Sequence, residues 1–308
     1  MATNNFKAFG IGAGANVTSQ ADYEALAALL TGFQSGKASS AQINKALRQS
    51  TVMAYVLAQF ISDSASVDVL DNGNPATILA NLKGSMTALT PGRLLNVRVF
   101  SASTPYIKTP GTRKTRWRVI GAGGGGGGAA ATGSGQFSAG GGGLAGSYAE
   151  SPLIDPPADN TAITVGAKGK GGAAGANTGI AGGATSVGSI ISAPGGGGGV
   201  GGAASAYSNI VAQIGSPTNA PSGSVLFYSR GAPAASVTGF STGLIKGGDG
   251  GASFFGIGGA GGQSVTSSSP SPAMNYGSGG GGAALGQNGS AVAGADGADG
   301  LVIVEEYA

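Results

Sequence analysis

The sequence contains neither cysteine nor histidine in 308 residues, and only 9% of its residues are charged. Disulfides and thiol nucleophiles are therefore excluded, as are the usual zinc sites and any Ser-His-Asp triad. Carboxylates that could hydrolyse a glycosidic bond exist at Asp155, Asp159 and Asp249, but nothing places two of them at a working separation. We expect no enzymatic activity, no catalytic residues, no metal site and no cofactor.

Long apolar runs are also missing. No stretch approaches the roughly 18 consecutive apolar residues that are needed to span a bilayer. The segment from Met1 to Lys7 lacks the charged start and the apolar run of a secretory signal. We therefore expect a soluble protein that is made in a cytoplasm.

Glycine, in contrast, accounts for 63 residues, of which 54 follow residue 120. The tract from Gly121 to Gly128 has echoes at 140–143, 195–199 and 279–282. A disordered linker would be polar and charged, whereas this chain is 41% hydrophobic. We therefore predict an ordered glycine-rich domain, although ordering a glycine costs roughly 0.5–1 kcal/mol more than ordering an alanine.

Backbone hydrogen bonding indicates how such tracts could be ordered. Extended, polyproline-II-like glycine segments make no internal hydrogen bonds, so their N–H and C=O groups need lateral partners. Four or more tracts could pack as a bundle, with the intervening segments as loops at its end. The G-x-G-x-x-G match at Gly121, Gly123 and Gly126 does not indicate dinucleotide binding, because no amphipathic helix and no acidic residue follow as required.

The segments between the tracts hold most aromatic residues of this domain. Aromatic side chains more often belong to a core than to a contact surface, but several lie among Ser, Asn, Pro and Gly, as in exposed loops. Exposed aromatic side chains suit sugar faces or protein patches. The candidate receptor-binding residues are Tyr207, Phe227, Tyr228, Arg230, Phe254, Phe255 and Tyr276.

Residues 1–18 carry apolar side chains on a glycine-containing backbone, namely Phe6, Phe9, Ile11 and Val17. This composition suits an extended arm that docks on another protein, and these four residues are the candidate contacts. A frayed terminus explains the composition equally well.

Capping residues predict two of the helices that follow. Ser19 and Asp22 form a capping box for a first helix, which ends at Thr31 and Gly32. Asn74 caps a short helix with Pro75 at its first position, and Gly84 is the residue at which we expect this helix to end.

A longer helix, over about 41–62, is predicted between these two, with a capping box at Ser39 and Gln42. Its apolar residues recur at spacings of 3 and 4, which is the seam of a short coiled coil. The helix could pack on the first helix or around an axis with other copies, and the seam does not determine their number. The candidate interface residues are Ile43, Leu47, Ala54, Leu57 and Ile61.

Beta structure is predicted from residue 94 onward. Residues 94–100 alternate as a strand with Leu95, Val97 and Val99 directed inward, and residues 104–107 form another. A basic strand over 113–120 leads into the glycine tract, and residues 301–304 form the last strand. These two strands can pair, because the termini of a domain often lie close together.

Charge is distributed unevenly along the chain. Residues 1–118 carry a net charge of +7, and residues 119–308 a net charge of −4. The basic excess could attract nucleic acid, but a solvated strand face explains it better. We expect no nucleic-acid partner.

The resulting fold class is α+β. Residues 1–18 form a docking arm, residues 19–92 a helical oligomerisation and attachment region, and residues 93–308 a β-rich domain with polyglycine-II-like packed tracts and receptor-binding loops.

With these segments in place, the chain resembles tail fibre or receptor-binding proteins of tailed bacteriophages. The resemblance is carried by residues 15–17, 30–36, 48–50, 58–61 and 76–83 in the N-terminal part. It continues at 110–114, at 119–121 with the glycine tract, and at 299–307.

This resemblance implies a homotrimeric virion fibre, made in the host cytoplasm, whose N-terminal region binds phage tail or baseplate proteins. Its distal domain would bind an outer-membrane protein or a surface glycan of the bacterium. The chain is also similar to glycine-rich phage adhesins, whose tracts pack as polyglycine helices with recognition loops at the tip. The alternatives are a structural tail component without receptor role and a polysaccharide depolymerase.

Overall fold

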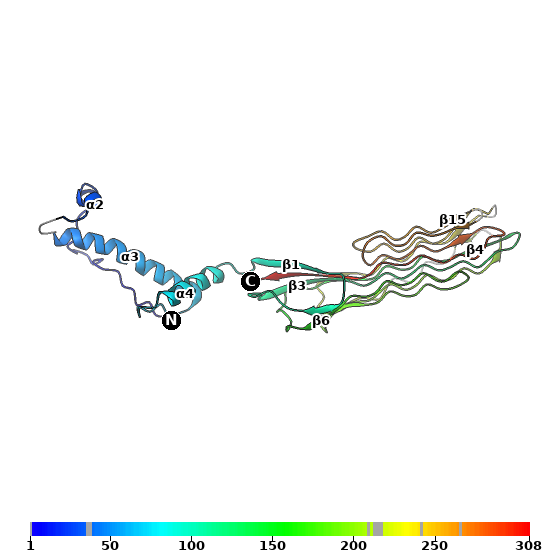
Figure 1. Ribbon diagram of the computed structural model, residues 1–308, viewed down its shortest axis with the longest axis horizontal. Helices are drawn as coiled ribbons and strands as arrows, with labels where there is room; N and C mark the ends of the chain where they lie inside the picture. The colour runs from blue at the N-terminus through cyan, green and yellow to red at the C-terminus, as the bar shows by residue number, and fades with distance from the viewer. Residues whose placement is uncertain (1, 35–38, 208–209, 212–217, 241–242, 265–266) are drawn as a thin grey trace. The chain divides into compact units, whose positions relative to one another are not determined.

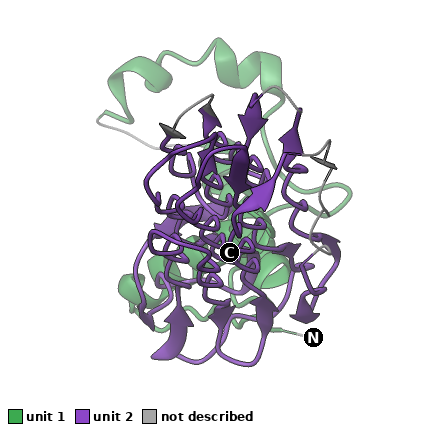
Figure 2. Cartoon of the chain, turned by 90° about the vertical axis from the view of Figure 1, so that its right-hand side faces the viewer, with its two compact units in different colours: residues 1–93 green, residues 94–308 purple. Residues whose placement is uncertain are grey.

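The computed structural model covers residues 1–308 and describes all of them except residues 1, 35–38, 208–209, 212–217, 241–242 and 265–266. The chain forms two compact units, Met1–Arg93 and Leu94–Ala308, which Figure 2 colours separately. We refer to them as the helical unit and the glycine-rich unit. The described part is mixed, with helices in the first unit and strands in the second.

The helical unit contains α1 (Gln20–Glu24), α2 (Ala28–Thr31), α3 (Ser40–Ala65) and α4 (Pro75–Ala88). Helices α3 and α4 pack against each other. Their small core consists of Ala58, Ile61 and Val69, with Phe6, Val67, Ile78 and Leu82 packed against it.

Two predicted helix caps are confirmed. The Ser19 hydroxyl accepts a hydrogen bond from the Asp22 N–H at 3.2 Å. Asn74 accepts one from the Thr77 N–H at 3.3 Å, and Pro75 occupies the first position of α4. Both caps provide partners for amide groups that have none within the helix.

Three other details of the helix prediction are wrong. The first helix is interrupted between Glu24 and Ala28, so that α1 and α2 are separate. The Ser39 side chain makes no capping hydrogen bond at the start of α3. Gly84 does not end α4, which continues to Ala88, because a glycine inside a helix costs only about 1 kcal/mol and packing can offset that.

The glycine-rich unit contains eighteen strands among its described residues, most of them two to four residues long. They form four sheets with the strand orders β1-β18-β3-β5-β12, β11-β8-β7-β6-β2, β10-β13-β14-β15 and β16-β17-β4-β9. The bounds are β1 Leu94–Phe100, β2 Thr104–Tyr106, β3 Lys114–Ile120, β4 Gln136–Ala139, β5 Tyr148–Glu150, β6 Thr161–Thr164, β7 Thr185–Val187, β8 Ile191–Ala193, β9 Ser205–Ala206, β10 Ile210–Val211, β11 Ser222–Gly223, β12 Phe227–Ser229, β13 Thr238–Gly239, β14 Ile245–Lys246, β15 Gln263–Ser264, β16 Ser267–Ser268, β17 Ala284–Leu285 and β18 Leu301–Tyr307.

The strand before the glycine tract and the last strand pair, as predicted. β3 and β18 are antiparallel along their full length, from Leu301 opposite Ile120 to Tyr307 opposite Lys114. β18 also pairs with β1 on its other side, as Figure 1 shows. The C-terminal strand is therefore an interior strand of its sheet, next to the central strand β3, and it closes the domain.

The predicted inward direction of Val97 and Val99 is wrong. The pairing of β1 with β18 shifts between Leu94 and Asn96, and such a bulge moves the following side chains to the opposite face. Val97 and Val99 are consequently exposed, whereas Phe100 packs against the core.

The main core of this unit lies between its first two sheets, where β3 and β5 contact β8. Trp117 and Val119 of β3 and Val302 and Val304 of β18 are fully buried there. Tyr106 of β2 meets Trp117 edge-on, with 4.9 Å between the ring centroids. The large side chains of the unit are thus concentrated beside the strands that lead into and out of the glycine tracts.

Beyond this core, lateral backbone hydrogen bonds order the glycine tracts. The N–H groups of residues 121–129 donate in rotation to three neighbouring segments, which run antiparallel to this tract, over distances of 2.8–3.0 Å. Gly121, Gly124 and Gly127 donate to Ser147, Leu144 and Gly141; Ala122, Gly125 and Gly128 to Gly183, Ile180 and Asn177; and Gly123, Gly126 and Ala129 to Ala298, Ala295 and Val292.

The carbonyl groups of the same tract accept from three further segments, which run parallel to it. These acceptors also follow a period of three residues, and the tract at 121–129 therefore has six hydrogen-bonded neighbours. The donors are Gly196, Gly199 and Gly202 in one segment, Gly169, Gly172 and Gly175 in the second, and Gly280 and Ala283 in the third. Figure 1 shows these segments side by side between β3 and β4.

Close approach explains why the tract consists of glycine. A Cβ atom on any residue from Gly123 to Gly128 would lie closer than 3.0 Å to a backbone atom of a neighbouring segment, a separation that real side chains do not show. All six residues are buried. The bundle therefore has no room for side chains at these positions.

Candidate functional site

Tyr148 is the centre of an aromatic cluster beside the sheet. Its ring stacks on Phe254, with 4.0 Å between the centroids and 6° between the planes. Phe227 and Phe255 meet it edge-on at 6.1 and 5.8 Å. Tyr148 itself is buried, whereas Phe227 and Phe254 are 51% and 54% exposed, so the cluster presents aromatic surface to solvent.

Strand pairing and one turn bring these residues together. β12 pairs with β5, which places Ser229 opposite Tyr148 and Tyr228 opposite Ala149. In the turn that carries Phe254 and Phe255, the Ser253 hydroxyl donates to the Tyr276 carbonyl oxygen at 2.6 Å. Five of the seven predicted receptor-binding residues therefore belong to one region: Phe227, Arg230, Phe254, Phe255 and Tyr276. Tyr228 belongs to the same strand as Phe227, but its side chain is on the opposite face of the sheet from Tyr148, because successive side chains of a strand alternate.

A pocket of about 270 Å³ opens within this region. Its lining includes Tyr148, Ser229, Arg230, Gly231, Ser253 and Phe254. The sequence indicated Arg230 and Phe254 but not Tyr148, whose role depends on the pairing of β5 with β12. The composition of the loops could not predict that pairing.

Tyr207 lies apart from this region. Its ring stacks on Phe137 at 6.1 Å, and its hydroxyl accepts from the Gln287 N–H at 3.1 Å. Tyr148 is opposite Ile120, at the start of the central tract, whereas Phe137 belongs to β4, beyond the end of that tract. The eight residues between these ends span roughly 25 Å of extended chain, so the predicted residues form two separate groups.

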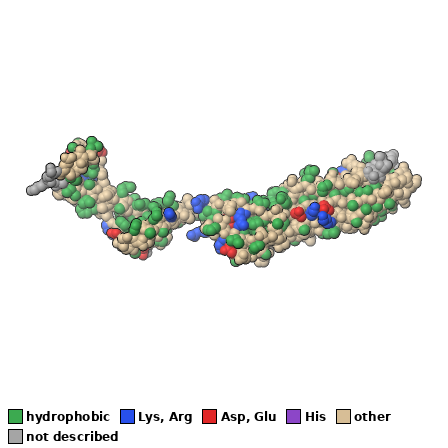
Figure 3. Space-filling view, in the orientation of Figure 1, with side chains coloured by type: hydrophobic (Ala, Val, Ile, Leu, Met, Phe, Trp, Pro, Cys, Tyr) green, Lys and Arg blue, Asp and Glu red, His purple; other side chains and the backbone are tan. Residues whose placement is uncertain are grey.

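The cations of the glycine-rich unit are mostly paired. Arg116 and Arg118 both bind Glu150, and Arg118 also binds Glu305 at 2.9 Å. Lys114 binds Asp155 at 2.7 Å. The charges of β3 at Lys114, Arg116 and Arg118 are therefore neutralised, and the visible face in Figure 3 shows basic side chains next to acidic ones.

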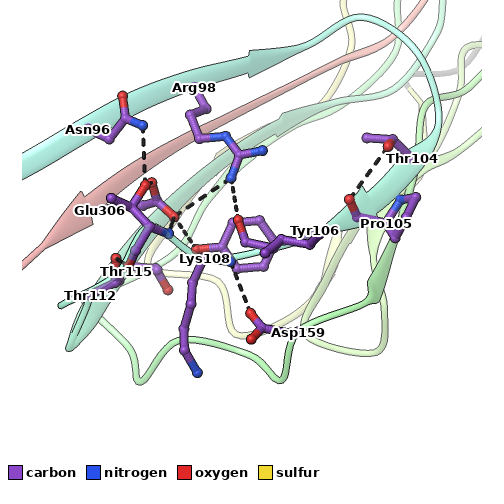
Figure 4. Close-up of polar contacts among 12 residues, drawn as sticks. Asn96, Arg98, Thr104, Pro105, Tyr106, Lys108, Thr112, Thr115, Asp159 and Glu306 are labelled. Carbon is purple, nitrogen blue, oxygen red and sulfur yellow. Dashed lines mark hydrogen bonds and ion pairs between the residues drawn. The ribbon is translucent and has the colours of Figure 1, made fainter.

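Glu306 is the most buried carboxylate that the structure describes, with a side chain 0% exposed. Its Oε1 accepts from the Tyr106 hydroxyl at 2.5 Å and from the Thr109 N–H at 3.0 Å, and its Oε2 accepts from the Thr109 hydroxyl at 2.6 Å. Arg98 lies 4.0 Å away, as Figure 4 shows. These contacts fasten β18 to the segment after β2.

The pKa of Glu306 reflects these contacts. Burial alone would raise it, but the hydrogen bonds from Thr109 and Tyr106 and the charge of Arg98 outweigh burial and lower the pKa below its ordinary value of 4.5. Burial and the hydrogen bond to Glu306 raise the pKa of Tyr106, so its hydroxyl stays protonated and donates. The network has the properties of a structural clamp.

The carboxylates considered for glycoside hydrolysis have structural partners. Asp155 binds Lys114, Asp249 binds Lys246 at 2.5 Å, and Asp159 accepts from the Lys108 N–H at 3.0 Å. Among the described residues, no group of three or more acidic side chains could hold a metal ion. In the same part of the chain, no helix has the length and hydropathy of a membrane span.

The four predicted docking residues of the N-terminal arm differ in their surroundings. Phe6 packs against the core of the helical unit, whereas Phe9 and Ile11 are exposed. The side chain of Val17 lies near Gly10. Phe9 and Ile11 are thus the members of this set that the unit leaves uncovered.

The predicted interface residues of α3 also divide into two groups. Ile61 is fully buried against Ala58 and Val69, so it serves the core of its own unit. Ile43, Leu47 and Leu57 are exposed by 39%, 45% and 48%, and Ala54 is half-buried. Met53, Val56 and Phe60 extend the exposed apolar surface of the helix.

Comparison with protein families matches residues 102–307 to the glycine-rich domain. The match covers two thirds of the chain and includes the tracts, the aromatic cluster and the clamp at Glu306. The comparison with curated proteins found no match.

Proposed function

The chain belongs to the glycine-rich domain family, and from that premise we propose that it is a tail fibre or receptor-binding protein that attaches a bacteriophage to its host. The observation that carries this proposal is the presence, in one unit, of a hydrogen-bonded glycine bundle and a cluster of exposed aromatic side chains. A bundle whose central tract consists mostly of glycine is a closely packed support, and the aromatic cluster is a surface suited to binding.

We propose further that the tracts are polyglycine-II-like helices. The rotation of donors and acceptors with a period of three residues supports this assignment, since a polyproline-II helix has three residues per turn and no internal hydrogen bonds. Packed in this way, the backbone is satisfied on every side and forms a scaffold on which loops can vary in sequence.

The proposed receptor surface is the region around Tyr148. Phe227 and Phe254 are each about half exposed, and exposed aromatic side chains of this kind are enriched in binding sites. The sheet holds this region in place, because β5 pairs with β12 on one side and with β3 on the other. β3 in turn leads directly into the glycine bundle.

The proposed attachment and assembly surface is the helical unit. Its helix α3 exposes the apolar side chains of Ile43, Leu47 and Leu57, and a stripe of this kind is stable in water when another helix covers it. We propose that three copies associate through α3, and that Phe9 and Ile11 contact proteins of the phage tail.

Competition with the phage tests the receptor role. The purified full chain, incubated with host cells before infection, should slow phage adsorption in a dose-dependent manner. The double variant Phe227→Ser/Phe254→Ser should lose this effect, and Val200→Ser is a matched control because Val200 is an exposed apolar residue, 71% accessible, away from the pocket lining. A chain that binds no host cells would instead be a structural tail component, and the proposal would fail.

A further inference from the structure

We propose that the pocket between Tyr148, Arg230 and Phe254 binds a carboxylated sugar residue, such as a hexuronic acid within a bacterial surface polysaccharide. This inference rests on the proposed function, because it names the chemical class of the receptor. Three observations support it: the charge of Arg230, the aromatic wall and the size of the pocket.

Arg230 is the cation that sets this pocket apart. After residue 120, the described cations Lys168 and Lys170 bind Asp296, and Lys246 binds Asp249. Arg230 is exposed, and no described acidic side chain lies within 4.0 Å of its guanidinium group. An arginine without a counter-charge at a pocket can bind a carboxylate through two parallel hydrogen bonds.

The backbone around Arg230 holds it in place. Ser229, which precedes it, pairs with Tyr148 in the sheet. Gly231, which follows it, lies so close to the Ala145 carbonyl that a Cβ atom would overlap that group. Because both neighbours are fixed, the backbone of Arg230 has a set position at the pocket, and binding requires little ordering of the main chain.

The aromatic wall suits the face of a sugar ring. One face of the Phe254 ring is covered by Tyr148, and the side chain is still 54% exposed, so an aromatic surface is left for a ligand. The C–H groups on one face of a pyranose ring are apolar and can pack against such a ring. The Ser229 hydroxyl donates to the Arg230 carbonyl oxygen at 3.2 Å, which leaves its oxygen free to accept from a sugar hydroxyl.

The pocket volume and the local charge narrow the choice of ligand. A volume of about 270 Å³ is just below the usual range for the sites of drug-sized ligands, and it suits one monosaccharide unit of a longer chain. A neutral sugar or an apolar peptide would leave Arg230 without a partner. Glu150, which accepts from the Tyr148 hydroxyl at 2.9 Å, is neutralised by Arg116 and Arg118, so it does not oppose a bound carboxylate.

Ligand titration followed by NMR tests this proposal on the full chain. The probes are methyl β-glucuronide and methyl β-glucoside, which differ only in the carboxylate. We expect the glucuronide to bind roughly tenfold more tightly, as is typical when a hydrogen-bonded charge pair is added. Arg230→Gln should abolish this difference, while Phe254→Ala should weaken the binding of both sugars.

The matched control is Arg113→Gln, which removes another exposed arginine of the same unit and should leave both affinities unchanged. Equal binding of the two sugars by the wild type, or an unchanged preference in the Arg230→Gln variant, would overturn the proposal. Binding only of acidic peptides derived from a host surface protein would overturn it as well.

Adsorption competition distinguishes a failure of the sugar site from a failure of the proposed attachment function. A chain that blocks adsorption without preferring the glucuronide refutes the sugar site alone, whereas glucuronide binding without blockade refutes the attachment function.

Discussion

Replacement of Gly124 by alanine is expected to destabilise the glycine-rich unit strongly. Gly124 is buried in the central tract, where its N–H donates to the Leu144 carbonyl and its own carbonyl accepts from the Gly280 N–H, both at 2.9 Å. A Cβ atom at this position would overlap the carbonyl of Gly197. The obstacle is backbone that is itself hydrogen-bonded, so the tract has to move and these two bonds lengthen or break.

The expected magnitude follows from these two bonds. A buried polar group that loses its partner costs about 1–3 kcal/mol, whereas the lower entropy of the unfolded alanine chain returns about 0.4–1 kcal/mol. Because two hydrogen bonds are affected, the net loss for Gly124→Ala is about 1–6 kcal/mol. For a unit of this size, at about 2–4 °C per kcal/mol, such a loss lowers Tm by roughly 2–24 °C.

Gly197→Ala is the matched control, because Gly197 belongs to a neighbouring tract but has space for a side chain. A Cβ atom on Gly197 would have Leu144 Cδ1 as its nearest neighbour, at 3.9 Å. Its substitution should leave Tm unchanged or raise it slightly. The assay is a thermal melt followed by tryptophan fluorescence, since Trp117 is the single tryptophan of the chain and is fully buried in the glycine-rich unit. Equal melting of the two variants would refute the packed-tract interpretation.

Acidification should destabilise the glycine-rich unit through Glu306. The pKa of Glu306 is lowered in the folded state, so the stabilisation is complete above the ordinary pKa of 4.5 and is lost as the pH falls through the folded pKa. In Glu306→Gln, stability followed by Trp117 fluorescence should depend less steeply on pH. An equally steep loss of stability in the variant would exclude the clamp. Asn74→Ala should cost the helical unit about 1 kcal/mol through the lost cap, seen as a lower midpoint in circular dichroism at 222 nm; an unchanged midpoint would contradict the role of the cap. Leu57→Asp should reduce the sedimentation mass to that of a monomer while Gln49→Asp does not, and an oligomer that survives the Leu57 change would show that α3 is not its interface.

Local sequence patterns correctly predicted those helix caps and strands that depend on interactions between residues close together in the chain. Ser19 and Asn74 cap helices because their side chains reach amide groups three residues further on. Alternation of charged and apolar residues identified β3, an apolar run identified the first four residues of β18, and the tendency of domain termini to lie close together predicted their pairing. The high glycine content and low charge content of the chain predicted that the glycine tracts are ordered. The hydrogen bonds of residues 121–129 confirm this.

The surroundings of the candidate site depended on contacts that no local pattern encodes. A single bulge at the start of β1 exposed Val97 and Val99, against the alternation rule. The aromatic residues were visible in the sequence, but Tyr148 and Phe254 meet only because segments about a hundred residues apart lie side by side. The loop that carries Tyr207 has a similar composition, but Tyr207 stacks on Phe137 beyond the other end of the tract.

The sequence by itself determined that the chain has a helical part and an ordered glycine-rich part that its last strand closes. Only the tertiary structure decided which tract contacts which, and therefore which loops share a surface. The physical reason is that glycine has no side chain with which to distinguish its neighbours. The partners of a tract are set by backbone hydrogen bonds on all its sides together, and these exist only once the whole bundle has formed.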